Sequence, residues 1–416
     1  MSILSQGSEA DASPRYADEA TGPFHQLIFT QTSGFWRDGQ MHVAAYWNST
    51  LRAHGVLVPG TTVVLTEDHS RESDVTVPLD PSLQPLLLRG FTTRNLLNRS
   101  LSYLRARSVV RRLVSQASFV LLEHVSSVAF LAGVAAIATR TPFYLEMGGS
   151  MSPPPGVVVR RPWRTRLARV YFRRVERRLA AHAKLLIAVS PHLHETFPQS
   201  NAPKVVSYHS LVNEEDIFVR DDSCAGREIT LFVATRIIES KGIDDLIKAL
   251  RRLRDEGRSV TLKIAGEGDY LPQLKKLAGE LRLEPHVTFL GGIPAGRQLW
   301  SHYRAADIVV LPSRGHYEGT PRMIIEAWAA GAPVIATDVG GIPAMVNQEA
   351  DGLLVPHADI EALTTAIKRV IDDTDLRRRL IIGGYARART MTFEGRLRLL
   401  RRAFEQHLPG LLPESG

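Results

Sequence analysis

Two glutamates eight positions apart, Glu318 and Glu326, mark the stretch of this sequence best suited to chemistry. Gly319, Thr320 and Pro321 lie between them. Threonine is a favourable N-cap and proline suits the first helical turn, so we predict a helix that begins at Pro321 with Thr320 as its N-cap. The first backbone N–H groups of a helix attract phosphate. With a carboxylate on each side, this stretch predicts a site for a ligand that is part phosphate and part polyol, such as a nucleotide sugar.

Two cations, Arg236 and Lys241, follow an apolar run and precede another helical stretch. An arginine can hold phosphate oxygens through two parallel hydrogen bonds, and a lysine adds a compact charge. Together they suit a diphosphate. The alternative is a salt bridge that only stabilises the start of the helix.

Parallel strands must position these residues. Residues 307–312 form an apolar run rich in β-branched side chains, which predicts a buried parallel strand just before Glu318. Open α/β sheets bind ligands at the carboxyl ends of such strands. From Glu228 onward, strand and helix patterns alternate, which predicts a doubly wound parallel sheet. Its strands are predicted to end near Ala234, Ala265, Leu290, Leu311, Thr337 and Val355.

The first half of the chain has a weaker pattern of the same kind. We predict a first strand at 24–30, a loop at 31–40 that contains Gly39, and a helix at 41–54. A strand at 118–124 presents His124 at its carboxyl end. Gly39 could bring backbone N–H groups close to phosphate or could be an ordinary turn glycine, and His124 could face a ligand or cap the next helix. Further strands are predicted at 61–66, 141–146, 185–190 and 205–209.

A chain of 416 residues is long enough for two domains. We predict a disordered tail at 1–23, an N-terminal Rossmann-like domain at 24–212 and a hinge at 213–227, where Asp, Cys, Ala and Gly residues are concentrated. The C-terminal Rossmann-like domain is predicted at 228–395. A last helix at about 396–416 is predicted to return to the N-terminal domain.

The motif E-G-T-P-R-M-I-I-E-A, from Glu318 to Ala327, followed by A-G-A-P-V-I-A-T-D-V-G-G-I-P, resembles the signature of family-four retaining glycosyltransferases. The resemblance is strong over about 228–375 and weak in the N-terminal half. It implies the GT-B fold, in which two Rossmann-like domains face each other across a cleft. The donor would be held by the C-terminal domain and the acceptor by the N-terminal domain.

The resemblance also implies roles for individual residues. Glu318 would orient the donor sugar, Glu326 would hold the ribose hydroxyls, and His124 would lie beside the sugar. Arg236 and Lys241 would stabilise the charge of the leaving nucleoside diphosphate.

The resemblance also implies further contacts with the donor, and these involve mainly backbone atoms. Backbone groups around Ile293 would read the base, while Gly266 and Gly39 would approach the donor closely. The chain departs from the family pattern where Asp38 replaces the first of two glycines and where Glu146 and Met147 replace a histidine and glycine.

We therefore expect a retaining transfer from a nucleoside-diphosphate sugar to an acceptor hydroxyl. No carboxylate stands out as a covalent nucleophile, so attack on the face that the leaving group vacates is favoured. Asp373-Thr-Asp375 is the only Asp-x-Asp and has no strand-end context. We thus expect no metal and no cofactor, with leaving-group charge met by Arg236, Lys241 and the helix N-terminus.

Charge and cysteine content limit compartment and partners. Cys224 is the only cysteine, which indicates a reducing cytoplasm. The net charge is +8, and residues 160–184 hold nine arginines and one lysine against Glu176, on a helical pattern with an apolar residue every fourth position. This helix is either a solvated surface or a docking face for an anionic acceptor or for anionic lipid on the inner face of the membrane. Nucleic acid is not expected, because no aromatic platform or zinc spacing accompanies the charge.

Two other functions stay open at this point. A nucleotide-sugar epimerase could use the same architecture and would need no acceptor. A catalytically silent protein that binds sugar nucleotides or docks on membranes is the second. Neither the donor sugar nor the acceptor follows from the sequence.

Overall fold

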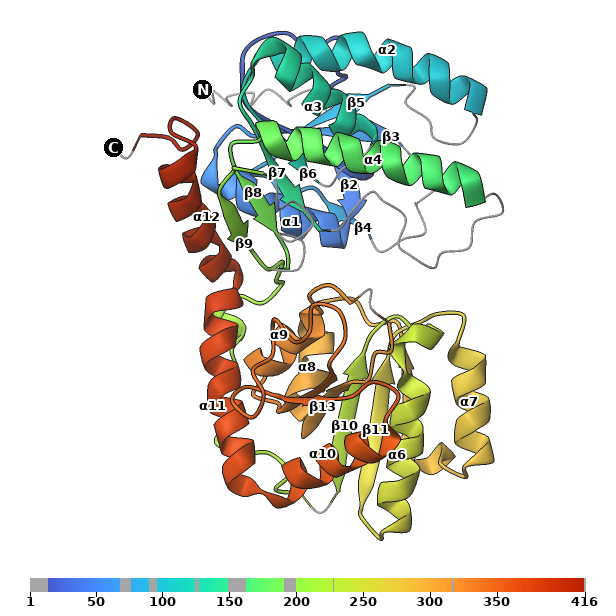
Figure 1. Ribbon diagram of the computed structural model, residues 1–416. Coiled ribbons are helices and arrows are strands. Elements are labelled where there is room, and N and C mark those ends of the chain that lie inside the picture. The colour runs from blue at the N-terminus through green and yellow to red at the C-terminus, as the bar shows by residue number, and fades with distance from the viewer. Residues whose placement is uncertain are drawn as a thin grey trace, which may run out of the picture. The chain divides into compact units, whose positions relative to one another are not determined.

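The computed structural model describes residues 14–67, 76–89, 96–123, 127–148, 162–190, 200–226, 228–315 and 318–414. Its backbone contacts divide the chain into two units (Figure 1). Unit 1 comprises 1–188, 193–206 and 399–416, and unit 2 comprises 189–192 and 207–398. Each unit is built on its own β-sheet with helices packed against it.

Unit 1 has a nine-stranded sheet with the order β4-β2-β1-β6-β7-β8-β9, and β3 lies beside β1 and β5. All pairs are parallel except β1 with β2 and β2 with β4. The strands are β1 Phe24–Arg37, β2 Gln40–Ala44, β3 Thr62–Glu67, β4 Thr76–Pro78, β5 Gln84–Leu88, β6 Ala117–Glu123, β7 Phe143–Met147, β8 Leu186–Ala188 and β9 Lys204–Val206.

The loop predicted at 31–40 is wrong. β1 continues to Arg37, turns at Asp38 and Gly39, and returns as the antiparallel strand β2. Both turn residues have positive φ, 50° for Asp38 and 75° for Gly39, which is the conformation that an Asp-Gly pair favours in a two-residue hairpin. The predicted helix at 41–54 accordingly begins later, as α1 at Ala45–Leu57.

Helices cover both faces of the unit 1 sheet. On one face, α2 Leu96–Ser115, α3 Ser127–Thr139 and α4 Pro162–His182 bury apolar side chains in a shared core with the strands. On the other face, His54 of α1 lies 2.5 Å from the Glu146 carboxylate, and both side chains are fully buried. Phe404 stacks on the His54 ring and meets Tyr144 edge to face. Phe404 belongs to the last helix, α12 Phe393–His407, whose residues from Leu399 onward are part of unit 1.

Two segments differ from their predicted character. Residues 14–23 were expected in a disordered tail, yet Ala17 is fully buried and Tyr16 forms a bridge with Leu87 of β5. The segment 213–227, expected as a hinge, belongs to unit 2 and is held there by specific contacts. Asp222, for example, accepts hydrogen bonds from Arg377 at 2.9 and 3.1 Å. Small and polar composition therefore does not make this segment a free linker.

Unit 2 has the predicted parallel sheet. Its six strands have the order β12-β11-β10-β13-β14-β15, and every neighbouring pair is parallel. The observed carboxyl ends match the predicted ones to within one residue, because the strands are mainly apolar and are bounded by polar or turn residues. The strands are β10 Ile229–Ala234, β11 Val260–Ala265, β12 Val287–Gly291, β13 Ile308–Leu311, β14 Val334–Thr337 and β15 Leu353–Val355.

The strand order of unit 2 reverses between β10 and β13. From β10 the chain adds β11 and β12 on one side, and it then crosses to the other side of β10 to form β13. Because right-handed crossovers that run in opposite directions along a sheet place their helices on opposite faces, both faces of this sheet are covered. α6 packs with α10, and α9 packs with α8 and α11. The carboxyl edge at such a reversal is where open sheets bind ligands. The helices are α6 Ile243–Asp255, α7 Leu271–Glu280, α8 Arg297–Ala305, α9 Arg322–Ala329, α10 Ile360–Asp372 and α11 Thr374–Met391.

Within the described part of the chain, no helix combines the length and the apolar character that crossing a membrane would require.

Candidate functional site

A cavity of about 510 Å³ opens at the carboxyl edge of the unit 2 sheet, where the strand order reverses. Loops after four neighbouring strands, β10 to β13, and the first turns of α9 contribute to it. Seven of the predicted site residues line it: Arg236, Lys241, Gly266, Ile293, Glu318, Pro321 and Glu326.

Arg236 and Lys241 bring positive charge to this cavity. Arg236 follows β10 and its side chain is exposed at the cavity. Lys241 lies in the short turn before α6, and its ammonium group is paired with a carboxylate oxygen of Glu318. Ser313 donates to the same Glu318 oxygen at 2.6 Å. The strand edges therefore gather two cations and a carboxylate within one cavity.

Glu318 is held by backbone as well as by its side-chain partners. Its carbonyl accepts a hydrogen bond of 2.7 Å from the N–H of Gly341. Gly340 has a φ of 58°, and a Cβ at this position would lie 2.2 Å from the Glu318 carbonyl oxygen. Only glycine fits there, so the Gly-Gly turn after β14 fixes the backbone of Glu318.

Glu326 lies in α9, with 8% of its surface exposed, beside the hydroxyl of Tyr303 at the end of α8. Burial raises the pKa of Glu326, while Tyr303 and the charge of Arg322 act in the opposite direction. Burial also raises the pKa of Tyr303 well above its ordinary value, and the negative charge of Glu326 adds to that shift. A carboxylate with few contacts to water can accept hydrogen bonds strongly from a ligand that enters the cavity.

The start of α9 differs from the prediction. The helix begins at Arg322, Pro321 is its N-cap, and no side chain caps it. Thr320 was expected as the cap, but its hydroxyl donates to the carbonyl of Val189. Gly319 and Thr320 belong to the loop that leads to the cavity and do not line it, although both were predicted to bind the donor.

Two other predicted site residues come from the first half of the chain. Gly39 lies in the β1–β2 hairpin of unit 1, and its contact with the donor stays a prediction. His124 follows Glu123, the last residue of β6, and falls outside the described residues, so its role stays a prediction.

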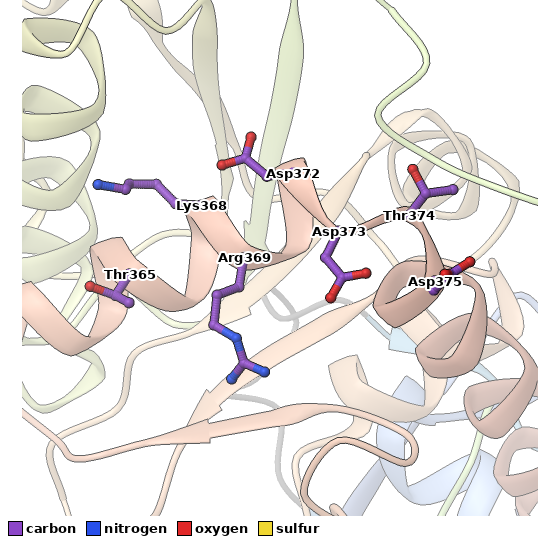
Figure 2. Close-up of a pocket in the computed structure, with 7 residues that line it drawn as sticks. All are labelled: Thr365, Lys368, Arg369, Asp372, Asp373, Thr374 and Asp375. Atoms are coloured by element: carbon purple, nitrogen blue, oxygen red, sulfur yellow. The ribbon is translucent and has the colours of Figure 1, made fainter.

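The Asp373-Thr-Asp375 segment lies far along the chain from this cavity, at the junction of α10 and α11. A surface pocket there is lined by three aspartates, two cations and two threonines (Figure 2). Asp373 accepts from the backbone N–H of Leu376 and caps α11, and Asp372 pairs with Arg258 at 2.7 Å. These carboxylates have structural partners. Among the described residues, no group of three or more His, Cys, Asp or Glu side chains could hold a metal ion.

Sequence reasoning missed part of the cavity wall. Tyr303 and Leu299 come from α8, and Arg322 and Met323 come from the first turn of α9. Arg322 directly follows Pro321, so its place in the motif was a usable signal. Nothing local marks Tyr303, because its relation to Glu326 exists only when α8 packs against α9.

Residues 214–387 match the family Glycosyl transferases group 1. The relatives include the GDP-mannose-dependent alpha-(1-6)-phosphatidylinositol monomannoside mannosyltransferase of Mycolicibacterium smegmatis, which is 31% identical over 47% of this chain and 55% of that protein. The D-inositol 3-phosphate glycosyltransferase of Nocardia farcinica is 38% identical over 39% of this chain and 37% of that protein. The matches thus span about a third to a half of these relatives.

Solved structures resemble nearly the whole chain. Anabaena HepE in complex with UDP superposes with a TM-score of 0.68 at 19% identity, over 92% of this chain and 100% of that one. Sucrose-phosphate synthase of Thermosynechococcus elongatus gives a TM-score of 0.67 at 19% identity, over 92% of this chain and 98% of that one. At this identity the likeness concerns the fold. Residues 214–387 thus match the glycosyltransferase group 1 family, within a chain that has the α/β GT-B fold.

Proposed function

We propose that this protein transfers a sugar from a nucleoside-diphosphate sugar to an acceptor hydroxyl. One observation carries the proposal: Arg236, Lys241, Glu318 and Glu326 line a single cavity at the carboxyl edge of the unit 2 sheet. The cavity offers cations for a diphosphate and carboxylates for sugar and ribose hydroxyls. The match to a glycosyltransferase family over the same residues supports it.

The charges in the cavity suit a dissociating donor. As the nucleoside diphosphate leaves, negative charge grows on its β-phosphate, and Arg236 and Lys241 can stabilise that charge more strongly in the transition state than in the ground state. Glu318 accepts hydrogen bonds and would orient the sugar as positive charge develops on it. Glu326 would hold the ribose hydroxyls. His124 remains our candidate for positioning the sugar from unit 1.

We further propose that the enzyme is a member of family four and retains the anomeric configuration. The acceptor would attack the face that the leaving group vacates, with the departing phosphate taking the acceptor proton. The spacing of Glu318 and Glu326 in the motif supports this assignment. Nuclear magnetic resonance of the product, taken before anomers equilibrate, distinguishes retention from inversion.

Metal independence is part of the proposal, because Arg236 and Lys241 supply positive charge where a divalent ion would otherwise be needed. Transfer is expected to continue in the presence of a chelator. A strict requirement for an added divalent ion would overturn this assignment of roles.

We propose a lipid-linked acceptor reached from the inner face of the membrane. The exposed side of α4 carries Arg173, Arg174, Arg177 and Arg178, and its one acidic residue, Glu176, is buried. Tyr171 and Val170, about half exposed, add apolar surface beside these arginines. Such a surface suits anionic lipid headgroups. The relative from Mycolicibacterium smegmatis, named for a phosphatidylinositol mannoside acceptor, supports the same substrate class.

The donor is identified by binding and then by turnover. UDP, GDP and their sugars are screened by thermal shift, since a ligand that binds only the folded state raises the apparent stability. Each sugar nucleotide that binds is incubated with and without lipid and soluble acceptors. Altered sugar nucleotide without any acceptor would indicate an epimerase. Binding with neither transfer nor sugar alteration would indicate a silent binding protein.

A further inference from the structure

Two loops that carry the proposed transfer site are joined by backbone. The first loop is 240–242, before α6, and contains Lys241. The second is 312–314, after β13, and leads to Glu318. The N–H of Arg314 donates to the carbonyl of Ser240 at 2.8 Å. Gly242 has a φ of 63°, and a Cβ there would lie 2.0 Å from the Pro312 carbonyl oxygen, so the two backbones are in direct contact.

The side chain of Arg314 adds a second connection. Its Nε donates to Asp245 at 2.6 Å and its Nη2 donates to Asp244 at 2.7 Å. Both aspartates lie in the first turn of α6, less than a tenth exposed. The hydrogen bond to Asp245, followed by that to Asp244, raises the pKa of Arg314 above its ordinary value. A guanidinium held by two carboxylates in this fork-like geometry has little freedom to move.

Arg314 does not line the cavity, so its contacts explain no direct ligand binding. These contacts instead fix the distance between the Lys241 ammonium group and the Glu318 carboxylate. Lys241 lies one residue before the contact of Gly242 with Pro312, and Ser313, which donates to Glu318, lies beside Arg314. Movement of either loop would separate the Lys241 ammonium from the Glu318 carboxylate and from the place where a β-phosphate would lie.

We propose that Arg314 is a positioning residue, which fixes Lys241 opposite Glu318 so that the ammonium group can meet the β-phosphate of the donor. This inference rests on the proposed function and deepens it. It assigns a role to the contact of Arg314 with Asp244 and Asp245, which the motif residues alone do not reveal.

The test compares nucleoside diphosphate with nucleoside monophosphate, because only the diphosphate carries the group that Lys241 would contact. Calorimetry measures the affinity of the full-length protein for UDP and for UMP, and likewise for GDP and for GMP. In Arg314→Met, the preference for the diphosphate is expected to fall about tenfold or more, the size of a lost charge-assisted hydrogen bond. Affinity for the monophosphate is expected to stay within about twofold, since its contacts lie elsewhere.

Further variants separate positioning from stability. Arg314→Lys keeps the charge without the fork and should restore the preference only in part. Adding Asp244→Asn and Asp245→Asn to Arg314→Met removes the buried charges that the arginine neutralised. This triple variant should regain stability and still lack the preference. The matched control is Arg258→Met, which breaks the paired hydrogen bonds of 2.7 and 2.8 Å to Asp372 away from the cavity and should leave the preference intact.

The outcomes are distinct. A wild-type preference for diphosphate that persists in folded Arg314→Met, or in the triple variant, overturns the positioning role alone. Wild-type protein that binds UDP no better than UMP, and GDP no better than GMP, overturns the proposed donor site and the positioning role with it. A selective loss in Arg314→Met and the triple variant, but not in Arg258→Met, supports the role.

Discussion

At the scale of single residues, burial determines how Glu326 can act. The residue is only 8% exposed and lies in a cavity wall, so hydroxyl groups that reach its carboxylate replace little water. Hydrogen bonds to a charged group in such a place are worth about 1.5–3 kcal/mol each.

Glu326→Ala is therefore expected to weaken binding of UDP or GDP, whichever the protein takes, by about tenfold or more. Calorimetry gives the affinity. Glu280→Ala, an exposed glutamate in α7 of the same unit, is the control and should bind normally. Equal affinity in Glu326→Ala and wild type would show that Glu326 does not contact the nucleotide.

Tyr303 gives a prediction about pH. Burial raises the pKa of Glu326, and the hydroxyl of Tyr303 partly offsets that rise by stabilising the ionised form. In the proposed site the ionised form would accept hydrogen bonds from the ribose hydroxyls, so protonation should weaken nucleotide binding as the pH falls. Tyr303→Phe removes the hydroxyl and raises the pKa of Glu326 further. The pH below which affinity declines should therefore move upward.

Calorimetric titrations from neutral pH downward follow the decline in nucleotide affinity of wild type and Tyr303→Phe. Tyr270→Phe serves as the control, because Tyr270 does not line the cavity. An identical pH dependence for wild type and Tyr303→Phe would remove Tyr303 from this role.

At the scale of elements, the Gly340-Gly341 turn after β14 supports the loop after β13. In Gly340→Ala the new Cβ would meet the Glu318 carbonyl at 2.2 Å, so Glu318 must shift. We expect a lower melting temperature together with a loss of transfer. Gly257→Ala has a similar φ, 79°, but no atom within 4 Å of the new Cβ. It should lose about 1 kcal/mol or more of stability and keep its activity. Full activity in Gly340→Ala would contradict the claim that this turn holds Glu318 in place.

The sequence predicted the elements of unit 2 well because its strands are largely apolar runs, and most of their residues are buried. Once those strands are parallel and adjacent, residues that follow them must meet at one edge. This is why Arg236 and Glu318, 82 positions apart, share a cavity. The β1–β2 hairpin was not predicted, although the Asp38-Gly39 pair is a hairpin signal, and both residues have the positive φ that such a turn requires.

Partners that depend on tertiary packing could not be read from the sequence. Arg314 meets Asp244 and Asp245 across about 70 positions, and no local pattern pairs them. The same holds for Tyr303 and Glu326. Composition was a poor guide for residues 14–23 and 213–227, where a few specific contacts outweigh polar character.

The basic face of α4 is also an element-scale feature. Reversal of Arg173, Arg177 and Arg178 to Glu is expected to abolish co-sedimentation with vesicles that contain phosphatidylglycerol, because each basic residue near an anionic surface contributes about 1 kcal/mol. Wild-type binding should weaken as salt is added. The control reverses three exposed cations of unit 2, Lys276, Arg282 and Arg378, with the same change in net charge. Wild-type protein that fails to sediment even at low salt would contradict membrane contact.

At the scale of the whole molecule, the cavity residues all belong to unit 2. Hydrogen exchange in the presence of UDP or GDP should therefore slow at 234–241, 265–267, 291–295 and 318–326. Exchange in unit 1 should change little with the nucleotide alone. The free nucleoside without phosphate is the matched comparison and should leave 234–241 unprotected. Protection confined to unit 1 would place the nucleotide site in that unit and contradict the proposed site in unit 2.

The division of the chain between the units also has a consequence for biosynthesis. Phe404 and Leu411 are fully buried in unit 1, although most of this unit precedes unit 2 along the chain and is translated before it. At about 5–20 residues per second, the ribosome needs roughly 10–40 s to make 207–398 before it reaches them. Until then the His54 and Tyr144 side of the unit 1 sheet lacks its cover. Unit 1 is thus begun before unit 2 but completed after it, and a premature stop codon near residue 400 would damage unit 1 directly.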